Sequence, residues 1–186
     1  ILDSSNRKVK KIDFDINAKL IENYTSQNVI GYIEGTQHPD SFLVVCAHYD
    51  HLGGMGDIYF PGANDNASGM AGTIEAARLL TKYKFKNSIV YTGLSGEEQG
   101  LFGGKHMAKV AKEKNWNIIG ILNNDMIGNI KGIDGVIDNR SFRIFSEPTP
   151  VNLDEQKRIW HRFYGGEVDG PSRQLARYVH RMTTTY

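Results

Sequence analysis

Four polar clusters, spaced along residues 42–125, constrain this chain more than any other feature. Each cluster follows an apolar run or stands at the mouth of a predicted helix. They are Ala47-His48-Tyr49-Asp50-His51, Ala63-Asn64-Asp65-Asn66, Gly96-Glu97-Glu98-Gln99 and Asn123-Asn124-Asp125. Carboxylates and imidazoles are costly to bury at one place unless an ion balances them. The pattern therefore predicts most of a two-metal hydrolytic site.

The apolar runs between these clusters predict an α/β fold. Residues 42–47, 88–94 and 118–122 are short and largely apolar, which is typical of strands covered on both faces. Helical spacing of apolar residues predicts helices over 68–82 and 103–114, between those strands. Strand, helix, strand, helix, strand makes two right-handed crossovers. We therefore predict a doubly wound, mostly parallel sheet with helices on both faces.

The rest of the chain predicts further elements with weaker patterns. A strand is expected at 29–34 and another at 142–145, and the glycine-rich residues 52–64 predict a long functional loop. Two more helices are expected, one capped at Asn152 and one opened by Pro171. The stripe of the 68–82 helix that should face the sheet is Met70, Ile74, Ala77 and Leu80.

The predicted strand ends coincide with the polar clusters. Parallel sheets bind ligands beyond the carboxyl ends of their strands. His48, Glu97, Glu98 and Asp125 lie at those ends, and Asp65 follows a loop that starts there. The strand positions follow from the apolar runs alone, so this coincidence supports the metal site.

The residue types fit a pair of zinc ions. Zinc accepts imidazole nitrogen and carboxylate oxygen, and two ions roughly 3.5–4 Å apart can share one carboxylate and a nucleophilic water. A carboxylate beside the ions must then take the water's proton and pass it to the leaving amine. Adjacent Glu97 and Glu98 suit this division, because neighbouring side chains point in different directions. Asp50 is placed to accept the other imidazole N–H of His48, whereas packing or turn roles suffice for Tyr49 and Asn66.

Composition excludes several other classes. The chain has 22 basic and 21 acidic side chains among 186 residues, so it has no field that would steer nucleic acid. No stretch approaches the roughly 18 apolar residues of a membrane span. Cys46 is the single cysteine, so an internal disulfide is excluded, and its place in the 42–47 run predicts a buried thiol. The length predicts one domain, residues 1–186.

In combination the motifs resemble those of the M28 family of zinc-dependent aminopeptidases. The resemblance covers residues 28–130 well and, more loosely, extends over 147–179 to the family's bacterial members. The motifs are His48-Tyr49-Asp50, Gly62-Ala63-Asn64-Asp65-Asn66-Ala67-Ser68-Gly69, Gly96-Glu97-Glu98-Gln99-Gly100-Leu101 and Asn124-Asp125-Met126. The resemblance implies a phosphorylase/hydrolase-like zinc exopeptidase fold, peptide substrates, and an extracellular or periplasmic location.

The same resemblance implies a role for each site residue. His48 and Asp125 would bind one zinc, Asp65 would bridge both ions, and Glu98 would bind the other. Glu97 would act as the general acid/base on a zinc-bridged water, so that the enzyme removes residues from peptide N-termini. The family also implies a cis peptide bond after Asp65.

One family feature has no counterpart in the sequence. The family's fifth ligand is a histidine in an Asp-His context, and no such pair follows Asp125. His51 is expected to lie near the site without binding an ion. We therefore expect a domain that lacks its C-terminal part, with a weak or absent ion beside Glu98. An uncovered sheet edge or apolar face would follow, open to self-association.

The motifs are compatible with three functions. The first is a co-catalytic zinc aminopeptidase, and the second a glutaminyl-cyclase-like acyltransferase that works with one zinc. The third is an inactive binding domain on the same fold. Zinc stoichiometry separates the first two, and hydrolysis of an aminoacyl-nitroanilide by a full-length form separates both from the third.

Overall fold

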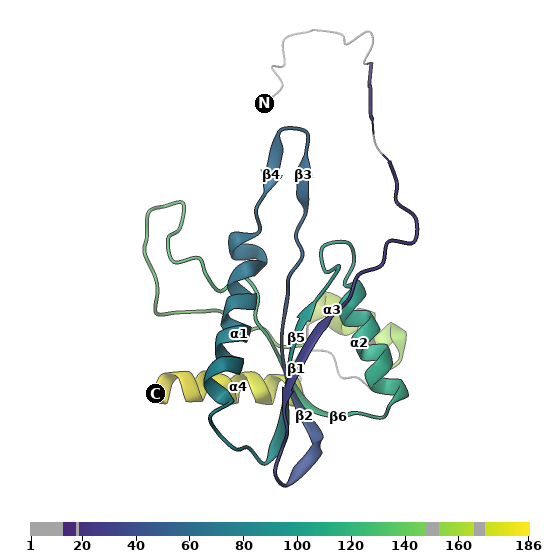
Figure 1. Cartoon of the computed structure of the whole chain (residues 1–186). Helices are drawn as coiled ribbons and strands as arrows, with labels where there is room; N and C mark the ends of the chain where they lie inside the picture. Colours follow the sequence, from purple (N-terminus) through teal and green to yellow (C-terminus); the bar gives the residue numbers. More distant parts are fainter. Residues whose placement is uncertain (1–12, 18, 148–152, 166–169) are drawn as a thin grey trace.

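A four-stranded mixed sheet forms the centre of the fold (Figure 1). The computed structural model describes residues 13–17, 19–147, 153–165 and 170–186. The strands lie in the order β1 (Val29–Ile33), β5 (Asn87–Leu94), β2 (His38–His48) and β6 (Asn117–Asn123). β2 runs parallel to both β5 and β6, whereas β1 runs antiparallel to β5. The predicted parallel core is confirmed, with one antiparallel edge strand.

Helices α1 (Gly69–Leu80) and α2 (Phe102–Glu113) cover opposite faces of this sheet. The α1 face buries Val45, Ile89 and Tyr91 against Ala76, Ala77 and Leu80. The α2 face buries Val44, Cys46 and Val90 against Met107. Alternate residues of β2 thus point to opposite helices, which is why its apolar run is uninterrupted.

Two details of the predicted packing were wrong. Ile74 is 61% exposed, and the small residue Thr73 takes its place against the sheet at 2% exposure. The strand predicted at 118–122 is not buried on both faces, because β6 is an edge strand and Ile119 and Ile121 remain about half exposed. An apolar run does not reveal whether a strand lies at the centre or at the edge of its sheet.

The β6 side of the sheet is open within the described part of the chain. No described strand pairs with the outer edge of β6. A hollow of about 690 Å³ lies between α2 and β6, with Met107, Trp116 and Ile121 among the residues that line it. The expected uncovered edge and apolar face are therefore present, whereas self-association through them stays a prediction.

The glycine-rich segment after His48 is a hairpin rather than a plain loop. Strands β3 (Gly53–Met55) and β4 (Ile58–Phe60) pair across a tight turn and project away from the central sheet (Figure 1). An irregular helical turn, η1 (Ala63–Ser68), then leads directly into α1. The many glycines hid this hairpin, because they disguise the period of two that marks a strand.

The C-terminal part contains two further helices, α3 (Glu155–Tyr164) and α4 (Pro171–Thr185). Asp154 caps α3 by accepting the N–H of Lys157, whereas the predicted cap Asn152 lies outside the described residues. Leu175 of α4 approaches β6 beside Gly120. The strand predicted at 142–145 does not form. In the described ranges no helix is both long and apolar enough to span a bilayer.

The buried thiol of Cys46 gives the first testable prediction. Burial raises the pKa of this thiol to about 11, and its side chain is 5% exposed. Because the thiolate is the reactive form, we expect the native protein to resist a thiol-reactive disulfide reagent at about pH 8. The protein unfolded in guanidinium should react completely within minutes. Fast, complete labelling of the native protein would contradict this packing.

Candidate metal centre

Three of the predicted metal ligands converge on one point. His48 is the last residue of β2, Asp65 lies in η1, and Asp125 follows β6 by two residues. His48 Nε2 lies 3.1 Å from Asp65 Oδ1 and 3.9 Å from Asp125 Oδ1. One potential ligand atom from each residue lies within 4.8 Å of the others. The structure therefore brings together the three side chains that the sequence predicted for one ion.

The protonation of His48 suits a metal ligand. Its ring is 3% exposed, and Nδ1 lies 3.1 Å from the backbone carbonyl oxygen of Asp50. A carbonyl oxygen only accepts, so Nδ1 carries the proton and donates it. Nε2 is then left facing carboxylates, an arrangement that requires either a second proton or a cation between them.

A second group forms beside the first and shares one residue with it. His51, Asp65 and Glu98 also place potential ligand atoms within 4.8 Å of one another. His51 Nδ1 lies 2.6 Å from Glu98 Oε1. Because Asp65 belongs to both groups, its carboxylate stands where a bridging ligand would. The sequence predicted Asp65 and Glu98 here, but it placed His51 only near the site.

Glu97 lies beside the first group and belongs to neither. Its Oε2 atom lies 3.9 Å from His48 Nε2. Burial, together with the charges of Glu98, Asp125 and Asp50, raises the pKa of Glu97, and His48 opposes that shift. A carboxylate with a raised pKa is better suited to hold a proton and release it again.

Asp50 acts differently from the prediction. Its carboxylate was expected to accept the imidazole N–H of His48, but the nearest carboxylate oxygen is 3.9 Å from Nδ1 and the backbone carbonyl takes that bond. The carboxylate instead accepts the backbone N–H groups of Glu97, at 3.1 Å, and Glu98, at 3.3 Å. Asp50 therefore fixes the turn that carries both glutamates.

The donor set fits zinc. Each group offers one imidazole and two carboxylates, which are ordinary zinc ligands. Burial, with the charges of Asp65 and Glu98, raises the pKa of Asp125 while His48 opposes the shift. A divalent cation at this point would reverse such a shift, because it stabilises the charged carboxylates.

Asn66 is the residue whose importance the sequence did not reveal. Its side chain is 1% exposed; Nδ2 donates to the carbonyl of Asn124, and Oδ1 accepts the N–H groups of Gly69 and Met126. The predicted cis bond between Asp65 and Asn66 is present. The amide therefore joins the segment that carries Asp65 to the segment that carries Asp125.

Neighbouring residues extend this connection. Asn64 Oδ1 accepts the N–H of Gly128, and Ser68 Oγ accepts the N–H of Ile127. Close packing also excludes a side chain at Gly69, where a Cβ atom would overlap the Asn124 carbonyl and the Asn66 amide. Asparagine and serine are common in turns, so sequence alone could not separate these long-range contacts from ordinary turn chemistry.

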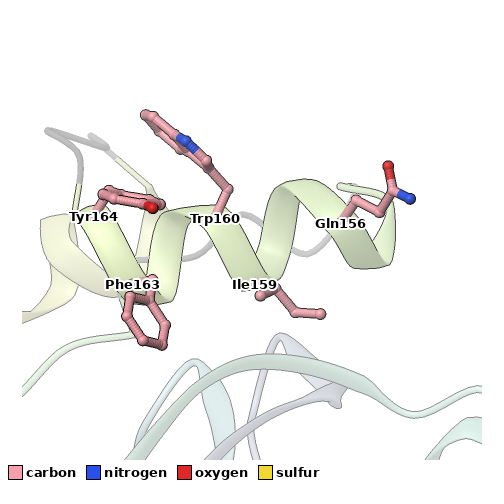
Figure 2. Close-up of a pocket in the computed structure, with 5 residues that line it drawn as sticks. All are labelled: Gln156, Ile159, Trp160, Phe163 and Tyr164. Atoms are coloured by element: carbon pink, nitrogen blue, oxygen red, sulfur yellow. The ribbon is translucent and has the colours of Figure 1, made fainter.

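A second hollow, on α3, is not a candidate for the catalytic site. It measures about 420 Å³ and lies on α3, where the side chains of Trp160 and Tyr164 point away from the helix on one side (Figure 2). Its lining contains no carboxylate, imidazole or thiol; it consists of Gln156, Ile159, Trp160, Phe163 and Tyr164. It therefore lacks the groups that hydrolytic chemistry requires.

Comparison with known proteins places this site in a family. The model of Peptidase family M28 matches residues 28–144, which is more than half of the chain. The chain belongs to peptidase family M28. The match includes both ligand groups and Glu97.

Curated relatives agree with this membership. A probable zinc metalloprotease of Pyrenophora tritici-repentis is 33% identical over 173 residues, covering 90% of this chain and 39% of that protein. One of Pyricularia oryzae is 36% identical over 158 residues, covering 82% of this chain and 31% of that protein. The chain thus spans about two fifths or less of their length. These relatives are fungal, whereas residues 147–179 loosely resemble the bacterial members of the family.

Solved structures of similar proteins include a zinc aminopeptidase and a glutaminyl cyclase. A zinc aminopeptidase from Bacillus subtilis is 26% identical, with a TM-score of 0.48 over 84% of this chain and 38% of that chain. A glutaminyl cyclase from an Acidobacteriales bacterium is 28% identical, with a TM-score of 0.49 over 62% of this chain and 42% of that chain.

Asn66 provides a prediction that is independent of metal. Replacing it by Ala leaves the Asn124 carbonyl and two N–H groups without their buried partner. We expect Asn66→Ala to lower the free energy of unfolding by roughly 2–4 kcal/mol in urea with a chelator present. The exposed Asn139→Ala is the control and should stay within about 0.5 kcal/mol of the unaltered protein. Equal stability of the two variants would show that the hydrogen bonds of the Asn66 side chain do not stabilise the fold.

Proposed function

We propose that this chain carries the catalytic centre of a co-catalytic zinc aminopeptidase. The observation that carries the proposal is the shared position of Asp65, which lies in both ligand groups while Glu97 stands outside them. Membership of the M28 family supports a metal-dependent peptidase. The N-terminal peptide bond is the proposed target because the motifs resemble those of the family's aminopeptidases.

Each side chain has a distinct part in this proposal. His48, Asp65 and Asp125 would hold one ion, and Asp65 and Glu98 would hold the other. Zinc bound there would polarise the scissile carbonyl and lower the pKa of water. The buried position of His48 and its Nδ1–H bond to Asp50 fix the imidazole in the tautomer that a ligand needs.

Glu97 moves the proton. Its carboxylate lies within 4 Å of the first group and is about one third exposed, so both a water molecule and a substrate can reach it. It accepts a proton from the attacking water and returns it to the leaving amine nitrogen. The Asp50 carboxylate maintains this position, because it holds the backbone N–H of Glu97.

A substitution at Glu97 tests this role. In the zinc-loaded protein we expect Glu97→Ala to slow hydrolysis of an aminoacyl-nitroanilide by roughly 10²–10⁴-fold, because the proton then has no acceptor. Zinc content by elemental analysis should stay unchanged, since Glu97 is not a ligand. The control is Glu113→Ala, an exposed carboxylate on α2. Hydrolysis that survives in Glu97→Ala would refute the role given to Glu97.

A further inference from the structure

The loop that carries Glu97 and Glu98 is closed at its base by a residue that is distant in the sequence. The loop connects β5 to α2. At its base the N–H of Gly103 donates to the carbonyl oxygen of Ser95 over 2.7 Å. Asn28, which stands just before β1, contacts both of these residues through its side-chain amide. The amide therefore bridges the two ends of the loop.

The Asn28 amide uses both of its polar atoms in this contact. Oδ1 accepts the N–H of Ser95 at 3.1 Å, and Nδ2 donates to the carbonyl oxygen of Gly103 at 2.9 Å. Ser95 is 9% exposed and Gly103 is buried, so water is a poor replacement for either bond. The fit is close, because a Cβ atom at Gly103 would overlap Asn28 Oδ1. Loss of the amide would leave the buried Ser95 N–H without this partner.

The segment that contains Asn28 makes two further contacts with the site. Ser26 Oγ lies 2.5 Å from Ser95 Oγ. The hydroxyl of Tyr49 donates to the carbonyl oxygen of Gln27 at 2.6 Å, and Tyr49 directly follows His48. This segment thus contacts both the strand end that carries the imidazole and the loop that carries the glutamates.

Asn28 and Asp50 hold this loop at different places. Asp50 accepts the N–H groups of Glu97–Glu98, whereas Asn28 holds the base. Between the base and the glutamates, Gly96 has a φ of +67°, a backbone conformation that glycine adopts without strain. Without the bonds at the base, the loop can rotate about this glycine and carry the glutamates away from the imidazole.

We propose that Asn28 is a positioning residue for Glu97. Its amide closes the base of the loop and so keeps Glu97 Oε2 at 3.9 Å from His48 Nε2. This inference rests on the proposed function, in which Glu97 is the general acid/base. Position matters for such a group, because a displacement of about 1 Å can slow a reaction by about 10²-fold.

The alternative role for Asn28 is to stabilise the fold without any effect on Glu97. Ser88 offers a matched control, because it makes the same kinds of bonds at the opposite end of β5. Its hydroxyl accepts the N–H of Gly35 at 2.9 Å and donates to the carbonyl oxygen of Pro39 at 2.7 Å, and the residue is 1% exposed. Asn28→Ala and Ser88→Ala therefore each remove one accepted and one donated hydrogen bond, but only Asn28→Ala removes them at the glutamate loop.

Amide hydrogen exchange in the metal-free protein measures the loop directly. We expect Asn28→Ala to speed exchange at the Glu97–Glu98 amides by about 10-fold or more relative to the amides of β2, because the loop opens locally. In Ser88→Ala this ratio should stay within about twofold of the unaltered protein. A residue that only stabilised the whole fold would leave the ratio unchanged.

The same variants test catalysis in the full-length enzyme at saturating zinc. With an aminoacyl-nitroanilide we expect Asn28→Ala to lower kcat by about 10-fold or more and to leave KM within about twofold. The reason is that proton transfer is impaired while substrate binding is not. Ser88→Ala should leave both constants unchanged. Asn28→Asp keeps the side-chain size and the bond from Ser95 but loses the donor to Gly103, so it should also lower kcat, and it provides the test if Asn28→Ala does not fold.

Three results would overturn the inference. They are a kcat in Asn28→Ala equal to that in Ser88→Ala, a change in KM alone, and exchange at Glu97–Glu98 that rises no more than in β2. An unaltered enzyme without peptidase activity would instead refute the proposed function. The exchange measurement alone would then decide whether Asn28 holds the loop.

Discussion

The structure depends on balancing the negative charge of the carboxylates that surround the buried imidazole of His48. Its Nε2 atom lies 3.1 Å from Asp65 and 3.9 Å from both Glu97 and Asp125. Nδ1 is already committed to a carbonyl oxygen, so only Nε2 can face these anions. A proton on Nε2 would supply one positive charge, whereas a divalent cation supplies two and uses the same atoms as ligands. The geometry is therefore best explained by an ion.

Two sets of hydrogen bonds hold the charged side chains in place. One set is made by an uncharged amide, and the other by a carboxylate that faces backbone N–H groups and not the His48 imidazole. The Asn66 amide ties the backbone after Asp65 to the backbone around Asp125. The Asp50 carboxylate faces the N–H groups of the Glu97–Glu98 turn rather than the imidazole. These satisfied polar groups offset part of the repulsion between the like charges.

Sequence patterns predicted the elements that pack regularly. The runs that became β2 and β5 and the stripes of α1 and α2 follow from burial alone, and the strand ends then placed His48, Glu98 and Asp125. The patterns did not predict what depends on side-chain direction or on position in the sheet. The exposed Ile119 of β6, the β3–β4 hairpin and the carbonyl bond to His48 are of this kind. His51 belongs with them, because only the loop conformation decides whether its ring faces Glu98.

The two ligand groups are assembled from different parts of the chain. The first needs β2, η1 and the end of β6, so it forms only when the parallel sheet is complete. In the second, His51 and Asp65 stand at the two ends of the segment that contains the β3–β4 hairpin, and pairing of that hairpin brings these two residues together. Glu98 follows β5, so it joins them only through the parallel pairing of β2 with β5. A short closed loop costs less conformational entropy than a contact between distant strands. Asp65 is common to both groups, so the hydrogen bonds of the Asn66 side chain, which fix the backbone next to Asp65, connect the hairpin segment to the backbone around Asp125.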